Sequence, residues 1–390
     1  MIFLDLGTQP LANDFLKSLN KQTTRYRLLV DFKKKTSLVS IKNKFQSAKM
    51  FNNKYPYRSS LSKTMNKNFK DLTKNIIKKF KPKKILEIGC NDGIFLKNFK
   101  NIKKIGIEPC KNIAQLAKMR NINVYEEYWN RKLSRKLKKK YADFDLIYSA
   151  NTITHINNLD EVFVAINYVM KDNGILIIED PSLLNCIKNV SYDQFYNEHI
   201  YVFSLISLKN ILKKHHLEIF NVENLKVHGG SNRYFIKKIN NNNIKIHKSV
   251  SKNYKKEIKF KLHKYSTYKK FGLKVINSKK LLISIFRQIR KLNHKIIGYG
   301  ATAKSVTVLN YCEFTKKDIK YFLDTTPEKK NKFIPGTNIK VKKYTKNSLN
   351  NMKYVFLGAW NFKKEIFKKE SKFINKGGKF ITHVPFPKII

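Results

Sequence analysis

The 390-residue sequence predicts an α/β protein with two doubly wound units, and three observations carry this prediction. Between residues 66 and 238, short apolar runs alternate with helical patterns, which is typical of a parallel sheet covered by helices. The first of these runs ends in a glycine-containing turn that leads into a helical pattern. A second strand–turn–helix pattern begins at residue 294. The same kind of nucleotide-type domain is therefore expected twice in one chain.

Composition and pattern divide the chain into four segments. Residues 1–65 are mixed and turn-rich, residues 66–238 form the first α/β unit, residues 239–293 begin with four asparagines and continue as a lysine-rich helical linker, and residues 294–390 form the second unit. Strands are expected at residues 84–88, 104–108, 123–125, 145–149, 174–179, 217–225 and 231–237, then at 295–297 and 320–323. The strands at 217–225 and 231–237 are expected to form the antiparallel end of the first sheet.

The formal net charge of +54 is extreme and is typical of proteins that bind nucleic acid or an anionic membrane. However, the lysines are spread along the whole chain with abundant asparagine and isoleucine, which is the signature of A/T-rich coding. We therefore favour solvated lysine faces that attract an anionic substrate, and we expect no membrane and no nucleic-acid partner. The start of the chain lacks a signal pattern and no run reaches 18 apolar residues, which predicts a soluble, cytoplasmic protein. Monomer and homodimer both stay open.

The turn after the first strand indicates the ligand. It belongs to the run K-I-L-E-I-G-C-N-D-G-I-F-L, in which Gly89 and Gly93 allow a tight backbone and leave room for a ligand. Glu108 ends the next strand, 19 residues after Gly89, and a carboxylate there can accept both hydroxyls of a ribose. These features indicate an adenosine-type ligand, and the alternative is an ordinary glycine turn. The E-x-G-x-x-x-G form with the second acid resembles motifs I and II of class I S-adenosylmethionine-dependent methyltransferases, so Glu87 and Asn91 are also expected at the cofactor.

The candidate chemistry follows the fourth strand of this unit. Asn151 and His155 come directly after it and are expected beside the same crevice. The run Y-D-Q-F-Y-N-E-H then brings five proton-transferring or strongly hydrogen-bonding groups into eight residues. His199 is the side chain best suited to act as a base near neutral pH, and Glu198 and Tyr196 could orient it or hold an enolate oxygen. A surface loop with a structural histidine is the alternative.

Two further turns carry weaker signals. The run H-G-G-S-N-R, from His228 to Arg233, contains an arginine that can bind an anion. The run G-Y-G-A-T-A, from residue 298 to 303, fits the G-x-G-x-x-A form of the dinucleotide fingerprint, and Asp324 follows 24 residues after Gly300. An NAD site, a substrate-side turn and a purely structural turn are all compatible with this pattern.

Taken together, these runs and the segments F-L-D-T-T-P-E-K-K-N-K-F-I-P-G-T and A-W-N-F resemble a family of sugar C-methyltransferases that act on nucleotide-linked 4-keto-deoxysugars. The resemblance extends from about residue 4 to the C-terminus. It implies a three-part enzyme with an N-terminal zinc-binding domain, a Rossmann-like methyltransferase core that binds S-adenosyl-L-methionine, and a C-terminal Rossmann-like domain that helps to hold the nucleotide-diphosphate sugar.

The resemblance also implies roles for individual residues. The family's catalytic Tyr-x-Glu-His falls on Tyr196, Glu198 and His199, with Asn197 where the family commonly has histidine. Further cofactor contacts are expected from Tyr57 and Ser59, which look like a lid, and from the N-x-x-x-H pair Asn151 and His155. Substrate contacts are expected from His228, Arg233, Tyr299, Lys304 and Asn310. This favours the substrate-side interpretation of the second glycine turn over an NAD site.

One departure from the family is large. Its zinc is held by two C-x-x-C pairs, but this chain starts after the place of the first pair and offers Lys33 and Thr36 at the second. Ammonium and hydroxyl groups cannot replace thiolates on zinc, so no metal is expected. Residues 1–65 are therefore expected either to fold by packing on their neighbours or to be poorly ordered.

The mechanism expected from the resemblance is methylation of carbon. A 4-keto group acidifies the hydrogen on the neighbouring sugar carbon, and His199, supported by Glu198 and Tyr196, removes that proton or stabilises the enolate. The carbon then takes the methyl group in line, which gives a branched sugar for deoxysugar or surface polysaccharide biosynthesis. Two alternatives stay open: an O-, N- or nucleic-acid methyltransferase, and a non-catalytic nucleotide-sugar-binding paralogue.

Overall fold

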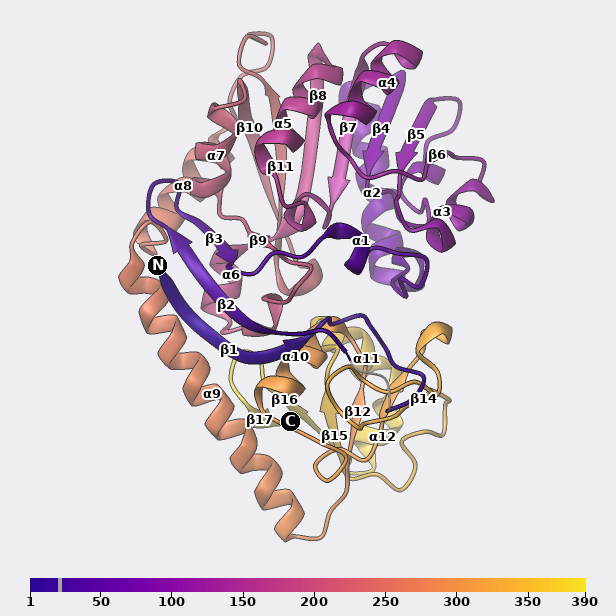
Figure 1. Cartoon of the computed structure of the whole chain (residues 1–390), viewed down its shortest axis with the longest axis vertical. Helices are drawn as coiled ribbons and strands as arrows, with labels where there is room; N and C mark the ends of the chain where they lie inside the picture. Colours follow the sequence, from indigo (N-terminus) through magenta and orange to yellow (C-terminus); the bar gives the residue numbers. More distant parts are fainter. Residues whose placement is uncertain (20–22) are drawn as a thin grey trace.

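The computed structural model describes residues 1–19 and 23–390. Two α/β bodies are joined along one side by a long helix, and an N-terminal sheet lies between them (Figure 1). The first body contains a seven-stranded sheet in the order β10-β11-β8-β7-β4-β5-β6. Its strands are β4 (Lys84–Ile88), β5 (Lys103–Ile107), β6 (Asn123–Tyr125), β7 (Phe144–Ala150), β8 (Met170–Pro181), β10 (Leu217–Leu225) and β11 (Ser231–Lys238).

The five strands from β6 to β8 are parallel, whereas β11 is antiparallel to both β8 and β10. This confirms the predicted doubly wound sheet with an antiparallel end. Neighbouring residues of a strand point to opposite faces, so Ile85 packs with α2 while Leu86 belongs to the core on the other face. The covering helices are α2 (Lys63–Phe80), α3 (Lys111–Lys118), α4 (Arg131–Tyr141), α5 (Leu159–Val169), α6 (Leu183–Lys188) and α7 (Leu205–Lys213).

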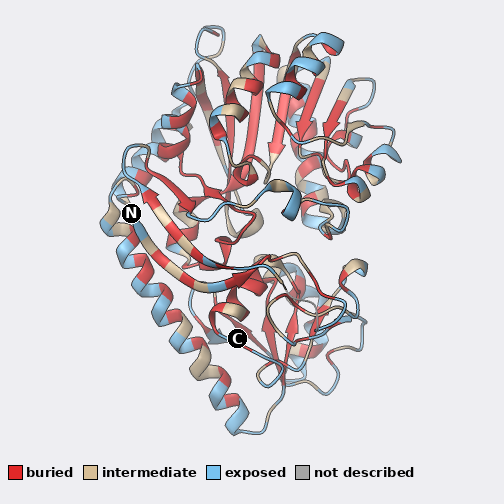
Figure 2. Cartoon of the chain, viewed as in Figure 1, coloured by how far each residue is buried: buried red, intermediate tan, exposed pale blue. Residues whose placement is uncertain are grey.

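The second body is a smaller six-stranded sheet in the order β14-β13-β12-β15-β16-β17, parallel except for β17. Its strands are β12 (Ile296–Tyr299), β13 (Phe322–Asp324), β14 (Val341–Lys343), β15 (Tyr354–Leu357), β16 (Lys379–Thr382) and β17 (Lys388–Ile389), with helices α10 (Ala303–Tyr311), α11 (Lys363–Lys369) and α12 (Ser371–Asn375). Buried residues fill the strands of both sheets (Figure 2).

The N-terminal segment is more regular than its sequence indicates. Strands β1 (Ile2–Pro10), β2 (Arg25–Lys33) and β3 (Leu38–Ile41) form an antiparallel sheet that is continued by β9 (Tyr201–Val202) of the first body. The expected turn-rich character is therefore wrong for much of residues 1–41. The apolar residues of this sheet have no independent core and are buried against other parts of the chain. After β3 the chain stays on the first body: Lys44 and Phe45 form hydrogen bonds with Asn157, and a short helix, α1 (Ser47–Met50), follows them.

The linker contains α8 (Lys248–Lys259) and α9 (Tyr265–Lys291), and α9 is the long helix that joins the two bodies. Its Tyr268 ring packs on Phe3 and Phe32 of the N-terminal sheet, with ring centres 5.0 and 4.6 Å apart. At Gly272 a side chain would collide with the Phe3 carbonyl oxygen at 2.5 Å, so strand and helix approach as closely as they can. Among the helices of the described residues, none has the length and apolar character to cross a membrane.

Candidate active site

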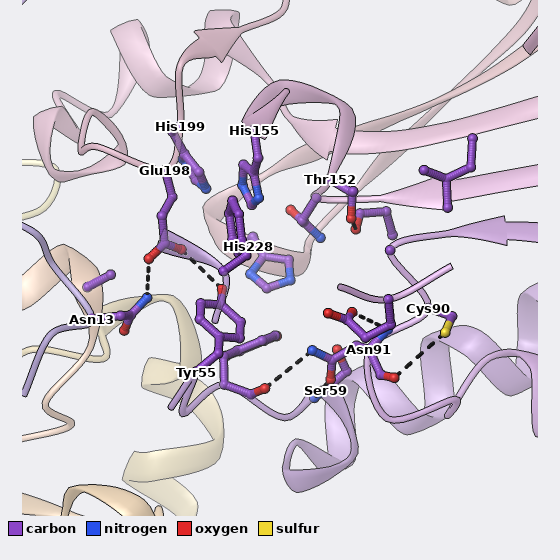
Figure 3. A pocket seen from close by; sticks show the side chains of 18 of the residues that line it. Asn13, Tyr55, Ser59, Cys90, Asn91, Thr152, His155, Glu198, His199 and His228 are labelled. Atoms are coloured by element: carbon purple, nitrogen blue, oxygen red, sulfur yellow. Dashed lines mark hydrogen bonds between the residues drawn. The ribbon is translucent and has the colours of Figure 1, made fainter. Parts of the chain in front are cut away.

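A cavity of about 290 Å³ lies at the carboxyl ends of β4, β5, β7 and β8. This edge is where ligands bind in open α/β sheets. The wall is completed by Asn13 of the N-terminal segment, by the segment from Tyr196 to His199, and by Lys304 of the second body. Figure 3 shows the side chains of Asn13, Tyr55 and Glu198, which are distant in sequence, pointing toward one another.

The turn after β4 forms one end of the cavity. Gly89 has a φ of +75°, and a Cβ there would lie 2.1 Å from Oγ1 of Thr152. The Glu108 carboxylate accepts hydrogen bonds from the backbone N–H groups of Asn91 (3.0 Å) and Cys110 (2.9 Å). Glu87 also lines the cavity, its Oε2 has no hydrogen-bond partner among the described residues, and burial raises its pKa well above the usual value. A glycine cradle with two carboxyl groups fits the adenosyl and amino groups of S-adenosylmethionine.

The predicted lid lies over this turn. The backbone N–H of Ser59 donates to Oδ1 of Asn91 at 2.9 Å, and Nδ2 of Asn91 donates to the Tyr57 carbonyl at 3.3 Å. All three residues line the cavity, whereas Gly93 does not. A Cβ at Gly93 would lie 2.4 Å from Cδ1 of Ile122. Gly93 therefore permits close packing beneath the turn, and the expectation that it contacts the cofactor is corrected.

Three histidines gather at the other end of the cavity, of which His155 and His199 are buried and His228 is half-buried. The rings of His155 and His199 stack with their centres 5.2 Å apart, and Phe51 stacks on the far side of His155 at 5.5 Å. Burial lowers the pKa of His155 and of His228 to about 3, and Nε2 of each lacks a hydrogen-bond partner among the described residues. Both rings are therefore neutral. Asn151 follows β7 with a φ of +50° and lines the same wall.

His199 is held in one tautomer. Its Nδ1 lies 2.8 Å from the Gln194 carbonyl, which can only accept, so Nδ1 carries the hydrogen. Nε2 is then an acceptor and receives the Tyr196 hydroxyl at 2.8 Å. Burial, together with His155 and Lys304, keeps the pKa of His199 well below its usual value. The pair is thus a neutral phenol bonded to a neutral imidazole.

Glu198 lies beside this pair but has other partners. Its Oε1 accepts Nδ2 of Asn13 at 2.6 Å, and its Oε2 accepts the Tyr55 hydroxyl at 3.0 Å. Burial raises its pKa to about 7. No hydrogen bond joins Glu198 to His199 in the described structure, which corrects the expectation that this carboxylate orients the imidazole. Asn13 and Tyr55 were not singled out in the sequence, since only the fold brings them to Glu198.

The second body contributes the beginning of α10. Thr302, Ala303 and Lys304 line the cavity, with Lys329 beside them. Lys304 is 8% exposed, and its ammonium makes no hydrogen bond or ion pair with any described residue. Burial lowers its pKa, whereas Asp193 opposes that shift. Lys329 donates to the Ala301 carbonyl at 2.8 Å. The two ammonium groups make this wall suited to an anionic ligand.

Three predicted substrate residues, Arg233, Tyr299 and Asn310, do not line the cavity. Arg233 forms ion pairs with Glu179 (2.9 Å) and Glu223 (2.8 Å) across the antiparallel end of the first sheet. The Tyr299 hydroxyl donates to Glu370 at 2.8 Å. Nδ2 of Asn310 donates to the carbonyls of Val306 and Pro335. Each polar group is satisfied within its own body, so these residues stabilise the fold. Of the substrate residues predicted from the sequence, His228 and Lys304 reach the cavity.

Within residues 1–19 and 23–390, no group of three or more His, Cys, Asp or Glu side chains is arranged to hold a metal ion.

Comparison with known proteins assigns both bodies. The family described as "Methyltransferase domain" matches residues 57–222, and the family described as "C-methyltransferase C-terminal domain" matches residues 226–385. The C-methyltransferase NovU of Streptomyces niveus is 25% identical over 308 residues, which cover 78% of this chain and 73% of that protein.

Two solved methyltransferases were also found. The O-methyltransferase of a trans-AT PKS multienzyme of Brevibacillus brevis, in complex with S-adenosyl-L-homocysteine, is 14% identical, with a TM-score of 0.34 over 55% of this chain and 82% of that one. The magnesium protoporphyrin IX methyltransferase ChlM of Synechocystis PCC 6803 is 9% identical, with a TM-score of 0.35 over 44% of this chain and 82% of that one. The two family matches therefore identify a class I S-adenosylmethionine-dependent methyltransferase, in which a methyltransferase domain is followed by a domain similar to the C-terminal domain of C-methyltransferases.

Proposed function

We propose that the protein methylates the carbon next to the ketone of a nucleotide-linked 4-keto-deoxysugar. One observation carries this proposal: the glycine turn after β4, the Tyr196–His199 pair and the free ammonium of Lys304 all line one cavity. The match to the C-terminal domain of C-methyltransferases supports carbon as the acceptor and favours this function over O- or N-methylation.

The two ends of the cavity would bind different ligands. The turn at Gly89, with Glu87, Asn91 and Glu108, would hold S-adenosylmethionine, which supplies an activated methyl group when bound. At the other end, Lys304 and Lys329 would attract the diphosphate of the sugar nucleotide. The sugar ring would then lie beside the histidines of the cavity, since these groups can move a proton.

Proton removal would use Tyr196 and His199 as a unit. Because the phenol already occupies Nε2, we propose that the Tyr196 oxygen takes the proton from the sugar carbon as its own proton passes to Nε2 of His199. Burial disfavours an isolated imidazolium, so His199 would keep this proton only while the negative enolate faces it. The carbon electron pair left behind would then form the new bond to the methyl carbon, while the bond from that carbon to the sulfonium sulfur breaks and its electron pair stays on sulfur as a neutral thioether.

The test is a product analysis. Protein is incubated with methyl-labelled S-adenosylmethionine and a panel of nucleotide-linked 4-keto sugars, and the product is identified by NMR. Without the methyl donor, wild-type protein in D₂O should still exchange the hydrogen next to the ketone. A label found on oxygen or nitrogen, or no exchange and no methylation with any keto sugar, would remove the proposal.

We also propose that the N-terminal sheet requires no zinc. Lys33 ends β2 and Thr36 follows it, so neither place offers a thiolate. A chelator should therefore leave the melting temperature unchanged, and elemental analysis should find no stoichiometric zinc. One zinc ion per chain would contradict this.

A further inference from the structure

A buried charge cluster joins the two bodies behind the cavity. Asp193, in the 3-10 turn from Tyr192 to Gln194, belongs to the first body and is completely buried. Its Oδ2 accepts the indole N–H of Trp360 at 2.6 Å and lies 3.1 Å from Nε2 of His383. Trp360 follows β15 and His383 follows β16, so both donors come from the second body.

The same cluster also touches groups of the cavity wall. The ammonium of Lys304 lies over the Trp360 ring, 5.5 Å from its centre. The ring packs so closely on Gly229 that a Cβ there would lie 2.3 Å from it, and Gly229 follows His228 directly. Burial alone would raise the pKa of Asp193, but His383, Lys304 and Trp360 together hold it below its usual value. Asp193 is therefore an anion opposite the buried Lys304.

Asp193 is linked to the proposed proton acceptor through the neighbouring residue in the chain and one hydrogen bond. The next residue, Gln194, accepts Nδ1–H of His199 with its carbonyl (2.8 Å) and donates its side-chain amide to the His228 carbonyl (2.9 Å). Two of the cavity histidines are thus anchored on the residue that adjoins Asp193. Asp193 itself does not line the cavity.

We infer that Asp193 is a positioning residue: held by Trp360 and His383, it fixes the segment that carries Tyr196 and His199 and keeps the ammonium of Lys304 opposite them. Its effect on catalysis rests on the proposed function, whereas its structural effect does not. A buried carboxylate is unfavourable unless it is paired and hydrogen-bonded. Its two donors come from fixed directions, so they set the orientation of the segment as well as its distance from the second body.

The central variant is Asp193→Asn, which keeps the volume and removes the charge. Hydrogen exchange measured by mass spectrometry should become faster in peptides that cover residues 191–200, with or without ligands. The value of kcat/KM for the keto sugar should fall by about 10²-fold, since small displacements of reacting groups have effects of this size. The affinity for S-adenosylmethionine should stay within about twofold, because Asp193 lies outside the cavity and its hydrogen-bond partners are Trp360 and His383 rather than residues of the turn at Gly89.

A pH profile separates positioning from general stability. The titratable groups that face Lys304 are Asp193, Cys186, His199 and His228. Of these, Asp193 is the acid that opposes the effect of burial on the pKa of Lys304. In Asp193→Asn the alkaline limb of the kcat/KM profile should therefore move to lower pH. Trp360→Phe keeps an aromatic ring beside Gly229 but removes one donor, and it should show the same changes at smaller size.

Glu257→Gln is the matched control. This carboxylate is also buried and also accepts two N–H groups, from Leu205 (2.8 Å) and Ile206 (2.9 Å), but it lies at the start of α7 and outside the cavity. It should lower the melting temperature without changing exchange in residues 191–200, kcat/KM or the alkaline limb.

Two outcomes would overturn the inference. The first is an Asp193→Asn protein whose residues 191–200 exchange at the wild-type rate. The second is one that melts earlier but, like Glu257→Gln, keeps the wild-type kcat/KM and pH profile, because that would show a merely structural role. If wild-type protein methylates no keto sugar, the proposed function fails, and the exchange measurement alone decides whether Asp193 holds the segment.

Discussion

The two glycine turns of this chain share a local geometry. In the first body, the Glu108 carboxylate accepts the backbone N–H of Asn91, which belongs to the glycine turn. It also accepts the N–H of Cys110, two residues after Glu108 itself. In the second body, the Asp324 carboxylate accepts the backbone N–H of Ala301, which belongs to the glycine turn (2.8 Å). It also accepts the N–H of Thr326, two residues after Asp324 itself (2.8 Å). Glu108 directly follows β5 and Asp324 is the last residue of β13, so both acids lie at the carboxyl end of the second strand of their unit.

The space in front of the two acids is what differs. Glu108 faces the cavity, whereas Asp324 does not line it and has the ammonium of Lys329 3.7 Å away. A Cβ at Gly300 would lie 2.4 Å from the Cβ of Ala359, so the second turn is filled by its own body. The second turn instead presents the beginning of α10 to the shared cavity. An acid after a glycine turn is thus compatible with a cofactor site, but open space beside it is also required.

Gly89→Val gives the largest expected difference between the turns. The valine side chain would collide with Thr152 and occupy the space proposed for the cofactor, so calorimetry should detect no binding of S-adenosylmethionine. Gly377→Val is the control, because Gly377 also has a positive φ, of +82°, but has no heavy atom within 4 Å of the added Cβ. A folded Gly89→Val protein with wild-type affinity would show that the first turn does not hold the cofactor.

His199→Ala tests the space between the turns. Loss of the proton acceptor should lower kcat by about 10²–10⁴-fold while the affinity for S-adenosylmethionine stays nearly intact. The variant should also fail to exchange the hydrogen next to the ketone in D₂O. His215→Ala is a control, because His215 is a buried histidine that pairs with Asp160 at 2.9 Å outside the cavity. Exchange and methylation at the wild-type rate in His199→Ala would assign proton removal to Tyr196 alone.

Exchanging the two acids for amides tests the comparison directly. Hydrogen bonds to a charged group contribute about 1.5–3 kcal/mol, so Glu108→Gln should weaken binding of S-adenosylmethionine by roughly 10–100-fold. Asp324→Asn should leave that affinity unchanged and lower only the melting temperature, since its oxygens hold the turn of the second body. Equal losses of affinity in both variants, measured by calorimetry, would mean that the second turn also contacts the cofactor.

The sequence predicted the first sheet well because its signals are local, whereas of the second sheet it predicted only the strands at 295–297 and 320–323. The ranges 84–88, 123–125 and 217–225 agree with β4, β6 and β10 residue for residue, since each is an apolar or alternating run with clear ends. The N-terminal sheet was missed because its strands are stabilised by contacts with α9 and β9, which are distant in sequence. The segment from Tyr196 to His199 was found through its density of polar groups.

The same reasoning failed where a residue type has both a structural and a functional use. Arg233 was expected to bind an anion, and it does, but the anions are Glu179 and Glu223 of the same sheet. Asn13 and Tyr55 reach Glu198 from more than 140 positions away in the chain, and the side-chain amide of Asn13 has no local pattern that marks it. Such long-range partners become visible only in the folded chain.

Glu198→Gln should have the smallest effect on rate, about tenfold or less, which corresponds to about 1.4 kcal/mol of barrier. The reason is that Glu198 contacts Asn13 and Tyr55 and not the proton acceptor. Instead, we expect Glu198 to make the stability of the folded protein depend on pH. Burial raises its pKa from 4.5 to about 7, so the folded protein favours the neutral carboxyl. The associated stability is complete below pH 4.5 and is lost as the pH rises through 7.

The glutamine variant lacks this titration. The unfolding free energy of wild-type protein should therefore fall relative to that of Glu198→Gln as the pH rises from 4.5 to 7. The fall should be roughly 1.36 kcal/mol for each unit by which the pKa of Glu198 is raised in the folded protein. Denaturant unfolding at pH 5 and pH 8 measures it. A constant difference across this range would mean that Asn13 and Tyr55 stabilise the carboxylate fully, and that the anion is the resting state of Glu198. In that case Glu198 would stand as a negative charge in the cavity, where it would face the ammonium group of Lys329.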